Sequence, residues 1–263
     1  MSNYIVDSAD LTSVANAIRT KGGTSASLAF PADFVSAIAA IPSGGGGNLD
    51  EIIERTATTI SSNATDIKIA IAQNNSALES ITFPEATKIS VGYVFQNCSK
   101  LISVSMPKLA NNSGYAAFQN CTSLEYVAFP EYMTSGANNM FDGCNKLKAA
   151  DFGNNTISLG NASVFAQNYF NKCTMLTTLI LRYSVVAKLG QINAFNQTPF
   201  ASGGSGGTIY IPKSLYDHLG DGTSLDYKAA TNWSTINGYG TITWAKIEGS
   251  QYENYYADGT PIT

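Results

Sequence analysis

The chain has 263 residues, of which 13% are charged, and its formal net charge is −4. This length allows a sizeable core, either in one long domain or in a small and a larger one. The charge excludes the basic surface that nucleic-acid-binding proteins use, and no stretch approaches the roughly 18 apolar residues of a membrane span. Residues 1–20 lack the basic start and apolar run of a secretory signal, so we expect a protein made in the cytosol that binds neither nucleic acid nor membrane.

Two short helices are predicted near the start of the chain. The first lies in DSADLTSVANAIRTKGG, where Asp and Ser residues can cap the helix and a Gly pair can end it. Its apolar residues recur at helical spacing: Leu11, Val14, Ala15 and Ile18. The second lies in FPADFVSAIAAIPSGGGG, with Pro31 at its start. We therefore predict an N-terminal helical module at residues 1–43 and a flexible glycine linker at residues 44–48.

A thirteen-residue phrase then occurs twice, 23 residues apart, as FQNCSKLISVSMP at 95–107 and FQNCTSLEYVAFP at 118–130. Looser copies begin at 141 and 170, and incomplete copies before and after them bring the number to five or six. They share the frame F-x-x-C-x-x-L-x-x-Φ-x-Φ, where Φ is apolar or Ala. We predict that these frame residues form a structural core: Phe95, Cys98, Leu101, Val104, Phe118, Cys121, Leu124, Val127, Phe141, Cys144, Leu147, Phe170, Cys173, Leu176 and Leu179.

The last two apolar positions of the frame alternate with period two, which predicts a short strand that is buried on one face. A single strand of this length cannot bury that face alone. Strands stacked in parallel about 4.8 Å apart form a continuous core, so the repeat predicts a solenoid. Pro84, Pro107 and Pro130 are placed to end the strands.

The frame F-x-x-C-x-x-L-x-x-V-x-x-P resembles the BspA-type leucine-rich repeats of bacterial surface proteins and of phage and prophage tail proteins. The resemblance covers residues about 56–245 and implies an α+β repeat solenoid, a right-handed, leucine-rich-repeat-like stack of short parallel strands. TIYIPKSLYDHLG…YKAATNWSTI, at 208–236, resembles the terminal cap of such proteins, with HLGDGTSLD inserted before Tyr227. We therefore assign the solenoid to residues 49–207 and a C-terminal cap and tail to residues 208–263.

The N-terminal module also has a counterpart in a known group of proteins. Its pattern resembles L-x-x-IA-x-AIR-x-KTG…F-P-x-x-F-x-x-A-I-x-x-I, a short helical segment of tail-fibre and minor tail proteins of phages. The resemblance implies attachment to a tail. Helices that only cover the first coil of the solenoid are the other interpretation, because terminal coils of repeat proteins need covering.

All four cysteines, Cys98, Cys121, Cys144 and Cys173, occupy the same position of the frame. Parallel stacking sets them in a row about 5 Å apart and not around one point, which disfavours a metal site. Side chains that run parallel into the core also disfavour disulfides, so we predict reduced, buried thiols. No cofactor is expected.

Enzymatic chemistry has little support in the sequence. His218 is the only histidine, and no nucleophile is visibly paired with it. A glycan hydrolase stays an alternative, because Asp142 with Asp151, or Glu125 with Asp151, could form a pair of catalytic carboxylates. Nineteen acidic residues also produce such pairs by chance. The segment SGGSGG at 202–207 precedes a strand and not a helix, which disfavours phosphate binding. We predict that the chain is not an enzyme.

Partner binding is predicted on the outward face of the strands and on the loops between copies. The strand face is polar and nearly uncharged, which suits a glycan or a peptide but also plain exposure to solvent. The loops are rich in Asn, Ser, Gly and Tyr, which binding loops share with ordinary tight turns. The candidate partner-binding residues are Ser103, Ser105, Tyr126, Asp151, Thr178, Tyr115 and Tyr132.

Together with the resemblance, these patterns favour a non-catalytic receptor-binding protein or adhesin of a phage or prophage tail, located in the virion. The solenoid would bind a glycan or protein on the host surface, and residues 1–43 would bind tail or baseplate proteins. Assembly of several copies of this chain into a homo-oligomer is also possible. The alternatives are a bacterial cell-surface leucine-rich-repeat adhesin and a glycan hydrolase on the same scaffold.

Overall fold

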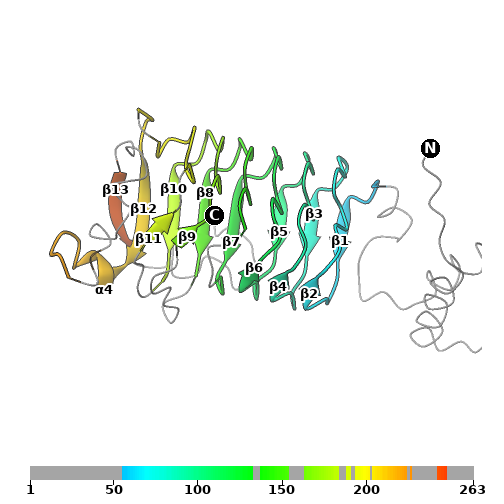
Figure 1. The fold of residues 1–263 in the computed structure, drawn as a ribbon, viewed down its shortest axis with the longest axis horizontal. Helices are drawn as coiled ribbons and strands as arrows, with labels where there is room; N and C mark the ends of the chain where they lie inside the picture. The colour runs from blue at the N-terminus through cyan, green and yellow to red at the C-terminus, as the bar shows by residue number, and fades with distance from the viewer. Residues whose placement is uncertain are drawn as a thin grey trace, which may run out of the picture.

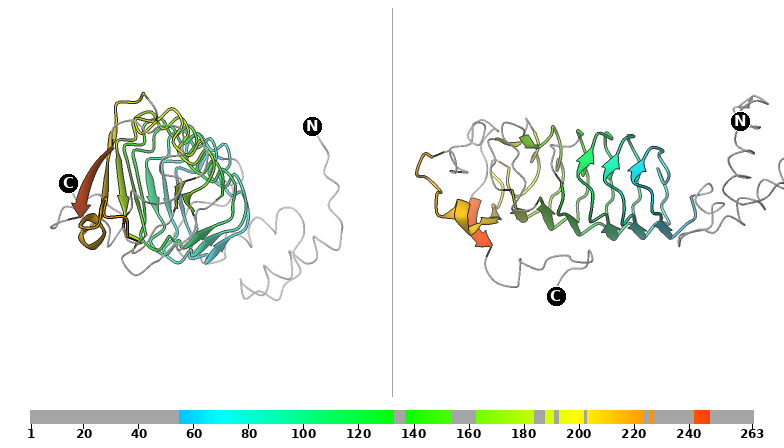
Figure 2. Two further views of the ribbon diagram at one scale, coloured as in Figure 1. Left: turned by 60° about the vertical axis from the view of Figure 1, so that its left-hand side comes forward. Right: turned by 90° about the horizontal axis from the view of Figure 1, so that it is seen from below.

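The structure is a computed structural model that describes residues 55–132, 137–153, 163–183, 188–190, 193–201, 203–223, 226 and 242–247. In these residues the chain winds into a stack of similar coils, which follow one another along the long axis of the solenoid (Figure 1). Viewed closer to that axis, the successive coils overlap in similar outlines (Figure 2, left). The predicted helical module at 1–43 and the glycine linker at 44–48 lie outside the described residues.

Eight parallel strands form what we call the main wall of the solenoid. β1, β3 and β5 form one sheet, and β7, β8, β10, β12 and β13 form another in that order. β5 packs beside β7, so the two sheets continue one another (Figure 1). The strands are β1 (Thr59–Ser61), β3 (Ser80–Thr82), β5 (Ser103–Ser105), β7 (Tyr126–Phe129), β8 (Ala149–Phe152), β10 (Thr178–Leu181), β12 (Gly207–Pro212) and β13 (Ile242–Ile247).

Shorter strands lie elsewhere on the coils. β2 (Asp66–Ile67), β4 (Lys88–Ile89) and β6 (Asn111–Asn112) form a separate parallel sheet outside the main wall. β9 (Ser163–Phe165) and β11 (Lys188–Gly190) form a parallel pair. The described residues contain one helix, α4 (Lys213–Tyr216), and none that is long and apolar enough to cross a bilayer.

The strand register places equivalent repeat positions side by side. Val127 on β7 is level with Ala150 on β8, which is level with Leu179 on β10, and all three side chains are buried. The same holds for Ile81 on β3 and Val104 on β5. The prediction of short parallel strands with one buried face is therefore confirmed.

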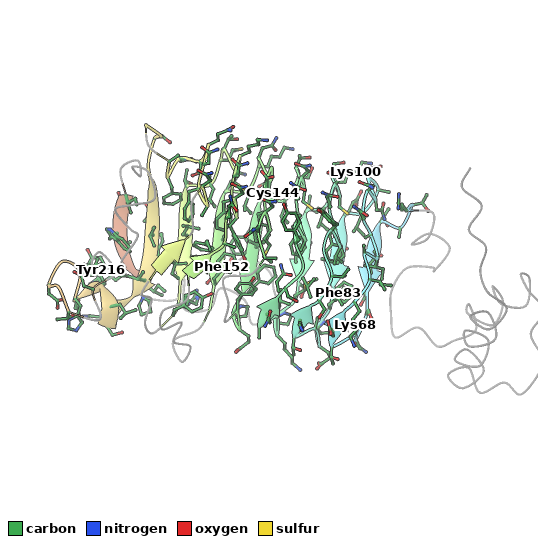
Figure 3. The ribbon with its side chains drawn as sticks, viewed as in Figure 1. Lys68, Phe83, Lys100, Cys144, Phe152 and Tyr216 are labelled. Atoms are coloured by element: carbon green, nitrogen blue, oxygen red, sulfur yellow. The ribbon has the colours of Figure 1, made fainter. Side chains whose placement is uncertain are left out.

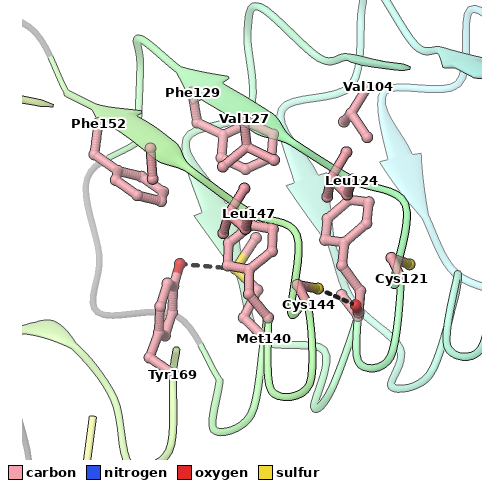
Figure 4. Close-up of a cluster of buried hydrophobic side chains, with 14 of the residues drawn as sticks. Val104, Cys121, Leu124, Val127, Phe129, Met140, Cys144, Leu147, Phe152 and Tyr169 are labelled. Atoms are coloured by element: carbon pink, nitrogen blue, oxygen red, sulfur yellow. Dashed lines mark hydrogen bonds between the residues drawn. The ribbon is translucent and has the colours of Figure 1, made fainter. Parts of the chain in front are cut away.

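The frame residues form the core of the solenoid. All fifteen residues that the sequence assigned to it are buried, with Val104 the most exposed at 7%. Their phenylalanines form a column along the stack, in which the ring centroids of Phe118 lie 5.3 Å from Phe95 and 5.4 Å from Phe141. Figure 4 shows the leucines and cysteines of successive coils repeating in the same way. Burying each such apolar side chain stabilises the fold by about 1.5–3 kcal/mol.

The residue before each cysteine turns the chain in the left-handed conformation. Its φ is 61° at Asn97, 60° at Asn120, 78° at Gly143 and 62° at Lys172. Glycine adopts this conformation freely and Asn tolerates it better than most residues. The turn therefore explains why Asn or Gly fills this position in three of the four F-x-x-C phrases.

The region expected to form a C-terminal cap contributes further wall strands. β12 pairs with β10, and β13 pairs with β12, both in parallel. Leu215 of α4 is buried and belongs to the same hydrophobic core as the repeats. Whether residues 208–263 act as a cap stays a prediction.

Candidate functional site

The cysteines lie inside the stack, where they connect neighbouring coils. Each thiol donates a hydrogen bond to a carbonyl oxygen of the preceding coil, as in Cys121 Sγ to Phe95 O at 3.2 Å and Cys144 Sγ to Phe118 O at 3.1 Å (Figure 4). All four are free and buried, and burial raises the pKa of Cys144 to about 12. The prediction of reduced, buried thiols is confirmed, and the described residues contain no group of side chains suited to a metal ion.

The outward face of the main wall carries four of the candidate partner-binding residues. Ser103 is exposed and Ser105 is half-buried on β5, next to half-buried Tyr126 on β7 and, two strands further, half-buried Thr178 on β10. Tyr126 is level with Ala149, which is level with Thr178. These four side chains are at least partly accessible. None of them is charged, and only Tyr126 is aromatic.

Asp151 was predicted as an outward binding residue, and this prediction is wrong. Its side chain is only 4% exposed and forms a two-pronged ion pair with Arg182, whose Nε lies 2.9 Å from Oδ1 and whose Nη2 lies 2.9 Å from Oδ2. Burial raises the pKa of Asp151 to about 6, although the Arg182 guanidinium acts in the opposite direction. Asp151 therefore has a structural role, and a binding partner cannot reach its side chain.

Tyr132 is a second incorrect binding prediction. It is fully buried, with its ring 6.0 Å from Phe129 and 5.7 Å from Phe152, and its hydroxyl contacts Met140 Sδ at 3.7 Å. Tyr132 was expected at the surface because it belongs to a loop between two copies of the repeat. Instead it fills the core between two coils.

The carboxylates on which the glycan-hydrolase alternative depended each have another partner. Both carboxylate oxygens of Asp142 accept amide hydrogen bonds, from Gln119 at 2.7 Å and from Asn171 at 2.8 Å. Glu125 forms an exposed ion pair with Lys148 at 2.6 Å. His218 contacts Asp221 Oδ2 through Nδ1 at 2.7 Å. Asp142, Glu125 and His218 are thus each engaged by a side chain other than the pairs that the sequence suggested.

Asp142 also belongs to a ladder of polar side chains that the sequence analysis missed. The residue after each frame phenylalanine, and after Ala72 in the first copy, is Gln, Asp or Asn, and it bonds to its equivalent on a neighbouring coil. The donors point toward Asp142 from both directions along the stack. The members are Gln73, Gln96, Gln119, Asp142, Asn171 and Asn196.

Exposed Tyr93 and Tyr115 lie in contact on neighbouring coils, buried Asn139 bonds to Tyr115, and exposed Ile69 stands one repeat before Gly92. We call Ile69, Tyr93, Tyr115 and Asn139 the aromatic corner. Ile69 is 65% exposed, Tyr93 40% and Tyr115 42%. The two tyrosine rings meet edge to face, with centroids 5.5 Å apart and planes at 64°. The sequence analysis identified Tyr115 as a binding candidate and missed the other three.

Two glycines allow the coils to approach closely at this corner. A Cβ on Gly114 would lie 2.0 Å from the carbonyl oxygen of Val91, and one on Gly92 would lie 3.0 Å from that of Tyr115. The Tyr93 N–H donates to the same Tyr115 carbonyl at 2.7 Å. The Gly-Tyr dipeptide, present in VGYVF and in SGYAAF, is the sequence signal that could have identified the pair.

Asn139 holds the hydroxyl of Tyr115 in place. Its Nδ2 donates to Tyr115 Oη, although only 8% of Asn139 is exposed. Its Oδ1 is buried and has no hydrogen-bond partner among the described residues. The corner therefore combines two open aromatic rings, a fixed phenol and an unsatisfied acceptor.

These features define the class of protein: a solenoid of short parallel strands with a leucine-rich-repeat type of core. The family model for the BspA type leucine rich repeat region matches in six copies, over residues 52–177 and 114–216. The chain belongs to this family.

Among solved structures, the chain is similar to three bacterial proteins. A leucine rich cell surface protein from Faecalibacterium prausnitzii A2-165 is 22% identical with a TM-score of 0.44, over 59% of this chain and 39% of that one. The pneumococcal vaccine antigen PcpA is 18% identical with a TM-score of 0.49, over 73% and 42%. The leucine rich repeat protein of T. pallidum is 16% identical with a TM-score of 0.39, over 53% and 76%. The chain spans about two fifths of the first two proteins, and a comparison with curated proteins gives no match.

Proposed function

We propose that the chain is a non-catalytic, adhesin-type binding protein that recognises a glycan or protein on a bacterial surface through its solenoid. The observation that carries this proposal is the aromatic corner. Five large apolar side chains stand out as exposed among the described residues, and Ile69, Tyr93 and Tyr115 at this corner are three of them. Exposed aromatic residues that gather in one place mark binding sites more often than single ones do.

The place of action that we propose is the tail of a phage or prophage, where many copies on one particle would strengthen weak binding at each site. Its support is the resemblance of residues 1–43 to helical segments of phage tail proteins, which would also provide the contact to tail or baseplate proteins. A bacterial cell-surface adhesin fits the repeat family equally well. Detection of the protein in purified tail particles supports the first, and detection on washed cells without particles supports the second.

Binding itself is tested with purified full-length protein on a panel of bacterial cells. We expect saturable binding to some members of the panel and no new reducing ends when the protein is incubated with their cell-wall polysaccharides. Release of reducing ends would favour the glycan hydrolase instead. Absence of binding to every cell type would contradict an adhesin role.

A further inference from the structure

We propose that the aromatic corner binds a sugar ring of a neutral glycan, with Tyr93 as the stacking platform and the Tyr115 hydroxyl as a hydrogen-bond donor. The proposal rests on the proposed function, because it names the ligand and the residues of that binding surface. It concerns the short segment of the solenoid that Ile69, Tyr93, Tyr115 and Asn139 occupy.

The geometry of the two rings assigns them different roles. Their planes meet at 64°, so a flat ligand ring cannot stack on both. The face of an aromatic ring attracts the partly positive C–H groups that a pyranose presents on one side. Tyr93 is 40% exposed, and its hydroxyl has no hydrogen-bond partner among the described residues, so we assign the platform to it.

The hydroxyl of Tyr115 is preorganised as a donor. Because Asn139 Nδ2 donates to Tyr115 Oη, one acceptor lone pair of the phenol is occupied and its own proton points away from the amide. Tyr115 is 42% exposed, so this proton can reach a ligand hydroxyl. A donor that is already oriented loses little freedom on binding.

The unsatisfied oxygen of Asn139 provides the matching acceptor. A buried acceptor without a partner destabilises the free protein, and a donor from a ligand would remove that penalty. Asn139 Oδ1 is closed to solvent, so a ligand hydroxyl can donate to it only after a local opening of the corner. Neighbouring hydroxyls on one pyranose both accept and donate, which matches this pair of groups.

Two further observations favour a neutral glycan over other ligands. No residue of the aromatic corner carries a charge, and exposed Lys68 beside Ile69 already faces Asp66 at 3.8 Å, so the corner favours a neutral ligand. Ile69 lies one repeat before Gly92, and coils stack roughly 5 Å apart, so the corner extends over roughly 10 Å along the stack. This is enough for about two sugar rings side by side.

The test uses full-length protein and an array of purified neutral and acidic bacterial polysaccharides. The variants are Tyr93→Ala, Tyr115→Phe and, as a control, Met175→Ala, whose side chain is 45% exposed outside the corner. We expect binding to neutral polysaccharides that falls on the order of tenfold in Tyr93→Ala. Tyr115→Phe keeps the ring and should lose about 2- to 12-fold. Met175→Ala should stay within about twofold of the unchanged protein, and thermal melting confirms that each variant is folded.

Cells treated with periodate, which oxidises sugar diols, or with protease separate the possible partners. Loss of binding after periodate and not after protease supports the proposal, and the reverse overturns it in favour of a protein partner. Equal binding by Tyr93→Ala, Tyr115→Phe and unchanged protein also overturns it, even if cells are bound. If no cell is bound but neutral polysaccharides are, in a way that depends on the corner, the adhesin role fails and the sugar site stands. If the protein binds no neutral polysaccharide on the array, the sugar site is refuted.

Discussion

Replacing Lys172 by glycine tests the left-handed turn of the F-x-x-C phrase. Lys172 holds this turn with a φ of 62°, and the equivalent residue one coil earlier is Gly143. The Lys172 side chain is exposed and forms no ion pair with any described residue, so the substitution removes no stabilising contact of that kind. The change therefore acts mainly on the backbone.

Two opposing terms set the expected gain. A non-glycine residue pays about 1–2 kcal/mol in the left-handed region, and glycine loses about 0.4–1 kcal/mol through the greater freedom of the unfolded chain. The difference predicts that Lys172→Gly raises the free energy of unfolding by about 0.5–1 kcal/mol. For a chain of this size, 1 kcal/mol corresponds to a rise of about 2–4 °C in Tm.

Urea unfolding followed by circular dichroism measures this difference, and an unchanged m-value shows that the unfolding transition is the same. Lys172→Ala is the matched control, because alanine also removes the side chain but keeps the cost of the turn. It should stay within about 0.5 kcal/mol of the unchanged protein. If the glycine variant is no more stable than the alanine variant, strain in this turn does not limit stability and the reasoning fails.

Three other predictions concern the core. Phe118→Ala should lower the free energy of unfolding by about 3–5 kcal/mol in urea, because its ring stacks on both neighbouring coils; a loss under about 1 kcal/mol would contradict a continuous column. The cysteines should resist a thiol reagent until urea unfolds the chain, since burial raises the pKa of Cys98 and of Cys144 to about 12; rapid labelling of the folded protein would refute their burial. Burial also raises the pKa of Asp151 from 3.8 to about 6, so its contribution to stability is complete below pH about 4 and is lost as pH rises through about 6. Urea titrations of the unchanged protein and of Asp151→Asn should show this fall only in the former, and parallel pH profiles would count against the raised pKa.

The core could be predicted from the sequence because its signal repeats. Phe95, Cys98, Leu101 and Val104 recur 23 residues later at equivalent positions, and chance does not preserve four spacings together. Each position faces the same environment in every coil, so the burial of one copy predicts that of the others. Period two within the strand then fixes which residues point inward.

The burial of Asp151 and Tyr132 could not be predicted from the same pattern. Period two tells on which side a side chain leaves the strand, but not which later segment lies over that side. The partner of Asp151 is Arg182, 31 residues further along the chain, and the sequence does not indicate this pairing. An outward strand position is therefore accessible only where no other segment covers it.

The aromatic corner depends on contacts between residues of different coils, which the pattern of a single repeat does not reveal. Tyr93 and Tyr115 stand one residue out of register in their copies, so a strict alignment of the repeats separates them. Their rings meet because Gly92 and Gly114 allow the backbones to approach. A search for small residues followed by aromatic ones at nearly the repeat spacing would have found the pair.

The ends of the cysteine column show why the outer copies depart from the frame. Each frame cysteine donates to a carbonyl of the preceding coil, as Cys98 Sγ does to Ala72 O at 3.1 Å. Asn75 takes the equivalent place one repeat earlier, and its Nδ2 donates to Ala57 O while its Oδ1 accepts from the backbone N–H groups of Ala77 and Leu78. At the other end, Thr198 donates within its own coil to Phe195 O at 2.7 Å. Residues with other hydrogen-bond partners thus take the cysteine position in the outer copies. The wall strands β1 and β12 still pair in parallel there, so a missing cysteine ends the column of thiols and not the stacking of the coils.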